Sequence, residues 1–317
     1  MQWIGPDYYG AFACIAGRCQ HSCCIGWEID IDDKAMQRWR RVPGEIGARL
    51  RAGISLEGGT PHFRLDSRQH CPMLEPDGLC SMICALGPDS LCQICRDHPR
   101  YRSFFSGRTE VGLGLCCEAA AGLILRRREK SRLVVLEDDH AAEPPLTAAE
   151  QSLLESRAQL IGRLQDRTRP VAERARELPL LCGGALPDRT PAWWADVFLS
   201  LERLETDWTD CLEGLRACDL RAAPPLTGPE WEIPFEQILV TFVYRHLPGA
   251  LDDGAFAARA AFASLAFVML RALCQAHYCR HGAVTPDDLV ELTRRYSAEI
   301  EYSDDNTEAL LELLDRA

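Results

Sequence analysis

The chain has 317 residues, is 47% hydrophobic and carries a formal net charge of −12 at pH 7. Its length exceeds the size at which one hydrophobic core usually stops growing, so we expect two packed parts. So acidic a chain is a poor candidate for nucleic-acid binding, because phosphate contacts need a basic face. The N-terminus lacks the pattern of a secretory signal, and the longest apolar stretch, "AAFASLAFVML", is too short to span a membrane. These features predict a cytoplasmic protein with no membrane partner.

The two parts of the chain differ in net charge. Residues 1–132 carry 18 Lys+Arg and 15 Asp+Glu, a net charge of +3, whereas residues 133–317 carry 17 and 32, a net charge of −15. An acidic C-terminal part suits a cationic partner, such as a lysine-bearing protein. The alternative interpretation of this acidic part is that its charge only keeps the protein soluble.

The cysteines also gather at one end. Eleven of the 16 lie between Cys14 and Cys117, and the other five are scattered. Persistent disulfides are uncommon in a reducing cytoplasm, whereas short repeated spacings are typical of metal chelation. The motifs are Cys14-x4-Cys19-x3-Cys23-Cys24, Cys71-Pro, Cys80-x3-Cys84, Cys92-x2-Cys95 and Cys116–Cys117. Only one of them has the form of a zinc knuckle, so structural zinc, an iron–sulfur site and a redox dithiol all stay open.

Residues 1–140 are expected to form a cysteine-rich metal-binding domain with many loops. Turn signals such as "EGGTPH" and "LEPDGLC" alternate with brief strand patterns, "HFRLD", "VGLGL" and "RLVVLE". Residues 141–317 are expected to form an α-helical domain, so the predicted fold class is mainly α, with a few short strands in the first part and a helical bundle in the second.

The first helices of the second part have clear start signals. Thr147 and Glu150 form a capping-box pattern before "QSLLESRAQLIGRL", and Pro170 ends that helix. Thr190–Pro191 is expected to start a helix with one continuous apolar face from Trp194 to Leu215. Four further helices are predicted at "PFEQILVTFVYRHL", "GAFAARAAFASLAFVMLRALCQAHY", "TPDDLVELTRRY" and "DDNTEALLELLDR".

The motifs of both parts resemble the flagellin lysine N-methylase family, whose cysteine-rich portion is akin to small CxxCxxCC domains that chelate zinc or iron. In the first part the resemblance rests on "FACIAGRCQHSCCIGW", "FRLDSRQHCPMLEPDGLCSM", "LGPDSLCQICRDHPR" and "GLGLCCEAAAGLIL". In the second part it rests on "FEQILVTFVYRHLP" and "YSAEIEYSDDNTEALLELL".

The resemblance implies methyl transfer from S-adenosylmethionine to lysine side chains of flagellin, by a protein that holds an iron–sulfur cluster of the 4Fe–4S type, with zinc as the alternative. The oligomeric state is left open, with a monomer favoured. The cysteines that match the family pattern are Cys14, Cys19, Cys23, Cys24, Cys71, Cys80, Cys95 and Cys116. Cys117 stands where the family usually has proline, and Cys84 and Cys92 occupy variable positions. The alternative function is a non-enzymatic zinc- or iron-chelating protein or a flagellar adaptor.

Catalytic residues are only weakly indicated. "GLGLCC" is an isolated G-x-G without a nucleotide-binding fold around it, and Gly26 stands where a third radical-enzyme cysteine would follow Cys19 and Cys23. Lysine methylation needs a neutral amine, which an aromatic or acidic wall can orient. The candidates for such a wall are Trp27, Glu236, Tyr244 and Tyr302. For each of them, packing is the interpretation that the sequence favours, and no residue is predicted for S-adenosylmethionine binding.

Overall fold

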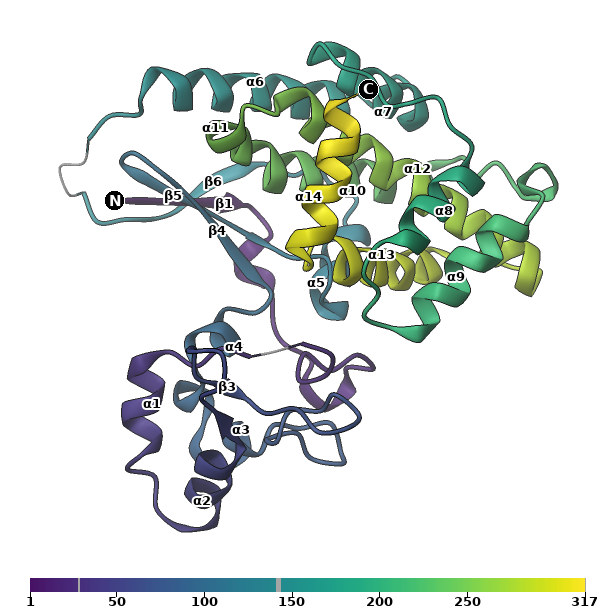
Figure 1. The fold of residues 1–317 in the computed structure, drawn as a ribbon. Helices are drawn as coiled ribbons and strands as arrows, with labels where there is room; N and C mark the ends of the chain where they lie inside the picture. The colour runs from purple at the N-terminus through teal and green to yellow at the C-terminus, as the bar shows by residue number, and fades with distance from the viewer. Residues whose placement is uncertain (28, 141–143, 317) are drawn as a thin grey trace. The chain divides into compact units, whose positions relative to one another are not determined.

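The computed structural model describes residues 1–27, 29–140 and 144–316 (Figure 1). The chain forms two compact units, which we call the helical unit (residues 1–12, 102–116 and 120–317) and the cysteine-rich unit (residues 13–101 and 117–119). The predicted boundary between 140 and 141 does not coincide with this division, because N-terminal strands pair within the helical unit. Residues 141–143, where the predicted second domain begins, lie outside the described residues.

The cysteine-rich unit consists of short elements joined by turns, as predicted. Its elements are α1 (Asp33–Trp39), α2 (Gly44–Gly53), β2 (Ile54–Ser55), β3 (His62–Phe63), α3 (Ser81–Leu86) and α4 (Gln93–Asp97). Its small core contains Trp39 and Phe63, whose rings stack with centroids 5.4 Å apart. The Asp32 carboxylate accepts hydrogen bonds from the backbone N–H of Ala35, at 2.9 Å, and of Gln93, at 2.7 Å. This one side chain therefore caps α1 and ties it to the start of α4.

The helical unit contains a four-stranded sheet in the order β4-β5-β1-β6. Its strands are β1 (Gln2–Pro6), β4 (Arg100–Phe105), β5 (Arg108–Leu113) and β6 (Leu133–Asp138). Strand β1 runs parallel to β5, with Trp3 opposite Thr109, and antiparallel to β6. The predicted strands at "VGLGL" and "RLVVLE" are therefore confirmed, whereas β1 has no counterpart in the prediction.

The helices account for most of this unit, which confirms the mainly α fold class. They are α5 (Glu118–Leu125), α6 (Ala148–Leu164), α7 (Val171–Leu181), α8 (Pro191–Ser200), α9 (Thr206–Ala217), α10 (Pro229–His246), α11 (Ala250–Asp253), α12 (Phe256–His281), α13 (Pro286–Ile300) and α14 (Asp304–Asp315). Helix α6 begins with the predicted capping box of Thr147 and Glu150, and α13 begins with a second one, of Thr285 and Asp288.

Helix α12 lies at the centre of the bundle, in contact with α7, α9, α10, α13 and α14 (Figure 1). It has 26 residues, more than the apolar stretch seen in the sequence, and is long and apolar enough to cross a membrane. However, 72% of its most apolar window is buried inside the protein. A helix that is apolar all round and enclosed by other helices is typical of a protein core.

The predicted single helix from Pro191 to Leu215 is wrong, because the structure has two helices separated by residues 201–205. The Glu299 carboxylate accepts hydrogen bonds from the backbone N–H of Leu204, at 2.8 Å, and of Glu205, at 2.7 Å. Asn306 accepts another from the backbone N–H of Glu202, at 3.0 Å. Partners from α13 and α14 thus satisfy backbone groups that a continuous helix would have satisfied itself.

Candidate functional site

Five of the eight predicted cysteine ligands gather in the cysteine-rich unit, with Cys24 in the middle. Its thiol forms side-chain hydrogen bonds with Cys23 and Cys71. Cys80 and Cys95 lie close enough to interact with it electrostatically. The backbone supports this arrangement, since the N–H of Cys71 donates to the carbonyl of Cys24 at 2.8 Å. We call Cys23, Cys24, Cys71, Cys80 and Cys95 the thiol cluster.

The hydrogen bonds decide which thiol of the cluster is charged. The thiols of Cys23 and Cys71 donate to Cys24 and hold its pKa well below the usual range. The same contacts with Cys24, followed by burial, raise the pKa of Cys23 and of Cys71. These contacts therefore favour the thiolate form of Cys24 and the neutral form of the thiols on both sides of it.

Cys92 also lies beside the thiol cluster, although it is not among the eight cysteines that match the family pattern. The residue is fully buried at the start of α4. A hydrogen bond with Cys95 lowers the pKa of Cys92, and the same bond is the main reason why that of Cys95 is raised. The C-x2-C spacing was the signal that identified this pair, because it places both thiols at one helix start.

Trp27 and His98 lie next to the cluster. The indole N–H of Trp27 donates to the carbonyl of Cys23 at 2.8 Å, and its ring packs edge-on against the imidazole of His98, 5.0 Å away. Burial lowers the pKa of His98 to about 4, with the opposing influence of Cys24 too small to restore it. His98 is therefore neutral at physiological pH.

The remaining predicted ligands are placed differently. Cys14 is exposed and interacts electrostatically with Cys23. The thiol of Cys19 donates to the carbonyl of His21, at 3.0 Å, and to the carboxylate of Glu118, at 3.5 Å. Cys116 belongs to the helical unit, where it interacts with the hydroxyl of Tyr302. The structure thus does not bring all eight cysteines into one group.

The thiol cluster fits a soft metal in its donor chemistry, because thiolates are the ligands of zinc and of iron–sulfur clusters. Within residues 1–27, 29–140 and 144–316, however, no group of three or more His, Cys, Asp or Glu side chains is arranged to hold a metal ion. The metal site therefore stays a prediction.

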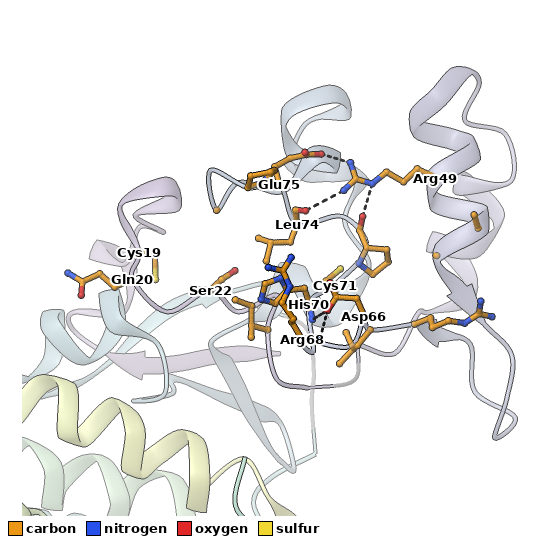
Figure 2. Close-up of a pocket in the computed structure, with 18 residues that line it drawn as sticks. Cys19, Gln20, Ser22, Arg49, Asp66, Arg68, His70, Cys71, Leu74 and Glu75 are labelled. Atoms are coloured by element: carbon orange, nitrogen blue, oxygen red, sulfur yellow. Dashed lines mark hydrogen bonds and ion pairs between the residues drawn. The ribbon is translucent and has the colours of Figure 1, made fainter. Parts of the chain in front are cut away.

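A cleft of about 830 Å³ opens beside the thiol cluster in the cysteine-rich unit (Figure 2). Its size is in the range of small-ligand sites. Cys19 and Ser22 line it on one side, and Cys71 connects it to the cluster. Arginines and His70 also line it, so the cleft combines thiol, basic and aliphatic surface.

Glu236 lies on α10 with its side chain buried. One carboxylate oxygen accepts a hydrogen bond from Arg167 at 2.8 Å, and the other accepts one from Arg174 at 2.7 Å. Both oxygens are thus occupied by guanidinium groups inside the protein. This arrangement stabilises the contact between α10 and α7, and a catalytic role for Glu236 stays an untested prediction.

The two candidate tyrosines also have partners. The hydroxyl of Tyr244 donates to the carbonyl of Val111 at 3.1 Å, and the guanidinium of Arg157 lies 4.8 Å from its ring centroid. The guanidinium of Arg245 lies 4.7 Å from the ring centroid of Tyr302. Burial raises the pKa of both phenols, so each is protonated at neutral pH and acts as a donor rather than as a base.

Comparison with known proteins gives matches in the C-terminal third. Residues 201–317 match the family model described as the FliB lysine N-methylase C-terminal domain. This segment contains α9 to α14, the centre of the helical unit. No solved structure matches the chain.

The similar curated proteins come from Salmonella. Two lysine-N-methylases, from Salmonella typhimurium and Salmonella choleraesuis, are 25% and 27% identical over 118 and 119 residues, which is 35% of this chain but only 29% of each relative. A flagellar biosynthetic protein, FliU of Salmonella muenchen, is 25% identical over 118 residues and is covered over 70% of its length. Residues 201–317 are therefore similar to the C-terminal domain of the FliB lysine N-methylase family.

Proposed function

We propose that this protein transfers methyl groups from S-adenosylmethionine to lysine side chains of flagellin, and that its cysteine-rich unit holds an iron–sulfur cluster. The observation that carries the proposal is the match of residues 201–317 to the FliB lysine N-methylase C-terminal domain. Two relatives are named lysine-N-methylase and a third is named as a flagellar protein, which supports the reaction and the substrate. The chain spans about 29% of the length of the two methylases, so the activity is inferred for it.

The thiol cluster would hold the iron–sulfur group. Cys23, Cys71 and Cys95 surround Cys24, and the charge on Cys24 meets the need of such a group for thiolate ligands. Held by these cysteines, an iron–sulfur group would supply iron as a Lewis acid for the methyl donor. A zinc ion on the same thiols would be structural instead.

The reaction itself needs a neutral lysine amine in line with the methyl group. Tyr244 and Glu236 are buried, whereas Tyr302 is half-buried. Because its phenol is protonated at neutral pH, Tyr302 cannot accept the lysine proton. To orient a substrate, its hydroxyl would exchange its interaction with Cys116 for a hydrogen bond to that substrate. Among Glu236, Tyr244 and Tyr302, we therefore propose Tyr302 for substrate positioning.

The decisive experiment incubates full-length protein, purified without oxygen, with flagellin and S-adenosylmethionine and follows the mass of flagellin peptides. We expect lysine peptides to gain the mass of one or more methyl groups. Binding of flagellin without any gain in mass would support a flagellar adaptor instead. The variant Y302F should bind flagellin normally and methylate it more slowly.

Metal analysis tests the cluster separately. We expect iron and acid-labile sulfide in equal amounts, with visible absorption that dithionite bleaches. Replacing Cys24 by serine should release the iron and expose the cysteine-rich unit to protease, whereas the matched change of Cys84, which lies outside the thiol cluster, should keep it. Stoichiometric zinc without sulfide would contradict the iron–sulfur proposal and favour a structural zinc site.

A further inference from the structure

We infer that the cleft of the cysteine-rich unit binds an acidic segment of a protein partner, through its arginines and its aliphatic surface. The inference deepens the proposed function, because it says which chemistry in a protein substrate the cleft recognises. Free carboxylates in the lining would attract the lysine of a methylation substrate. The described lining residues show the opposite arrangement, because the carboxylates are engaged within the protein and arginines remain available.

Glu75 is one of two carboxylates in the cleft, and it is already paired. It forms an ion pair with Arg49, and this arginine also donates to the carbonyls of Pro72, at 2.6 Å, and Leu74, at 3.3 Å (Figure 2). The guanidinium of Arg49 therefore fixes the wall of the cleft, and the charge of Glu75 is neutralised within the protein.

Asp66 is the other carboxylate, and it belongs to a turn. One of its oxygens accepts hydrogen bonds from the backbone N–H of Arg68, at 2.8 Å, and of His70, at 2.9 Å. These two bonds, the one from His70 being the stronger, lower the pKa of Asp66. Gln69 adopts a positive φ of 62° within the same turn, which the bonds to Asp66 hold in place. The carboxylate thus shapes the cleft wall from within.

Arg64 and Arg68 are the charges that remain available. Both side chains line the cleft and are exposed. Arg68 lies near enough to Asp66 to lower its pKa, but in the described part of the chain neither guanidinium makes a hydrogen bond or ion pair. Each can therefore offer its planar pair of donors to an incoming carboxylate.

The lining as a whole is a positive site on an acidic protein. Its three arginines and two carboxylates give a formal charge of +1, whereas the complete chain carries −12. A local charge of opposite sign to the rest of the surface concentrates anionic groups from solution. The net charge of the whole chain repels an anionic partner, whereas the cleft offers it the side chains of Arg64 and Arg68.

The aliphatic side chains of the cleft favour a peptide over a small anion as its ligand. Ile25, which is 41% exposed, lies in the lining with Leu65, Leu74 and Pro72. Such surface gains nothing from an inorganic anion but is covered by the side chains of a peptide. The cleft therefore fits an acidic residue beside an aliphatic one, in a segment of a few residues.

The test uses full-length protein and a fluorescein-labelled peptide, acetyl-Ala-Glu-Leu-Glu-Ala-amide, with binding followed by anisotropy at low salt. We expect the double variant R64Q/R68Q to weaken binding at least about fivefold, as two lost arginine–carboxylate contacts should do. R40Q/R41Q, which removes the same charge outside the cleft, should bind like the wild type. R64K/R68K should restore part of the affinity, and thermal unfolding should be unchanged in all three.

Three results would overturn the inference. Equal binding of the matched peptide with Gln in place of Glu would remove the carboxylate as the recognised group. Equal weakening by both double variants would mean unspecific charge attraction. Displacement of the peptide by inorganic phosphate at similar concentration would indicate a small-anion site. The binding assay contains no methyl donor, so its result does not depend on whether the protein methylates flagellin. If the peptide does not bind, the proposed methylation is still tested separately by the mass of flagellin peptides.

Discussion

The helical unit and the cysteine-rich unit bury their interiors by different means. In the helical unit, α10 and α12 contribute long runs of fully buried Phe, Leu and Ala side chains. In the cysteine-rich unit, the helices have five to ten residues, and the buried set is small and includes the thiols of Cys71 and Cys92. The comparison teaches that apolar packing is the main source of stability in the helical unit, whereas the cysteine-rich unit depends on its turns and its thiols.

Charge is also handled differently in the two units. The helical unit buries ion pairs, such as Glu110 with Arg157 and Glu236 with Arg174, whose side chains are at most 2% exposed. In the cysteine-rich unit, the pair of Arg49 and Glu75 is about one-third exposed on both sides. Buried pairs are costly to break, because the remaining partner is left charged in a medium of low polarity.

The largest effect is therefore expected from Glu236→Gln. The change removes the buried carboxylate partner of Arg174, which is only 4% exposed, and leaves it with the longer contact to Glu232 at 3.4 Å. It should lower the free energy of unfolding of the helical unit by about 3 kcal/mol. Urea unfolding followed by circular dichroism measures it. E312Q, which removes an exposed partner of Arg316, is the control and should stay within about 0.5 kcal/mol of the wild type. A stable E236Q protein without methylation would instead assign Glu236 to catalysis.

Equal truncations in the two cores sharpen the comparison. Leu270 in α12 and Leu50 in α2 are both fully buried. L270A and L50A should each cost about 2–5 kcal/mol, because each leaves a cavity. Hydrogen exchange should show that L270A weakens the helical unit while keeping it folded, whereas L50A exposes most of the cysteine-rich unit. Comparable protection of both units in both variants would contradict the difference in core size.

Removing the cap of α6 should have a smaller effect. The Thr147 hydroxyl accepts from the backbone N–H of Glu150 at 3.2 Å, while the Glu150 carboxylate accepts from that of Thr147 at 2.7 Å. T147A should therefore cost about 1 kcal/mol, and T147S should cost little because serine caps equally well. Thermal unfolding of both variants checks this, and an equal loss for T147S would point to packing of the threonine methyl rather than to capping.

The smallest expected effect is a pH dependence at the same place. Hydrogen bonds from the backbone N–H of Ser106, and then of Thr147, lower the pKa of Glu150 from 4.5 to about 2. A carboxyl whose pKa is lower in the folded state stabilises the protein above its unfolded pKa, and this contribution is lost as the pH falls from 4.5 towards 2. Carbon-13 NMR of the Glu150 carboxyl should show the low midpoint. E150Q should flatten the stability profile in this range.

The sequence by itself determined the local features of the fold. The capping boxes at Thr147 and Thr285 start α6 and α13 as their patterns predict, because a cap connects residues only three positions apart. The change from turn-rich cysteine motifs to helical periodicity likewise predicted the mainly α class. The gathering of cysteines in the first part and the match to the methylase family followed from the residues in the same way.

Only the tertiary structure decided features that depend on distant partners. The helix break at residues 201–205 requires Glu299, nearly a hundred positions away, and the parallel pairing of β1 with β5 joins residues that are over a hundred apart. A contact of this kind brings Cys24 next to Cys71. Cys92 lies beside Cys95, and Cys116 lies beside Tyr302. Spacing along a chain restricts only neighbours, so the packing of whole elements selects which of the cysteines come together.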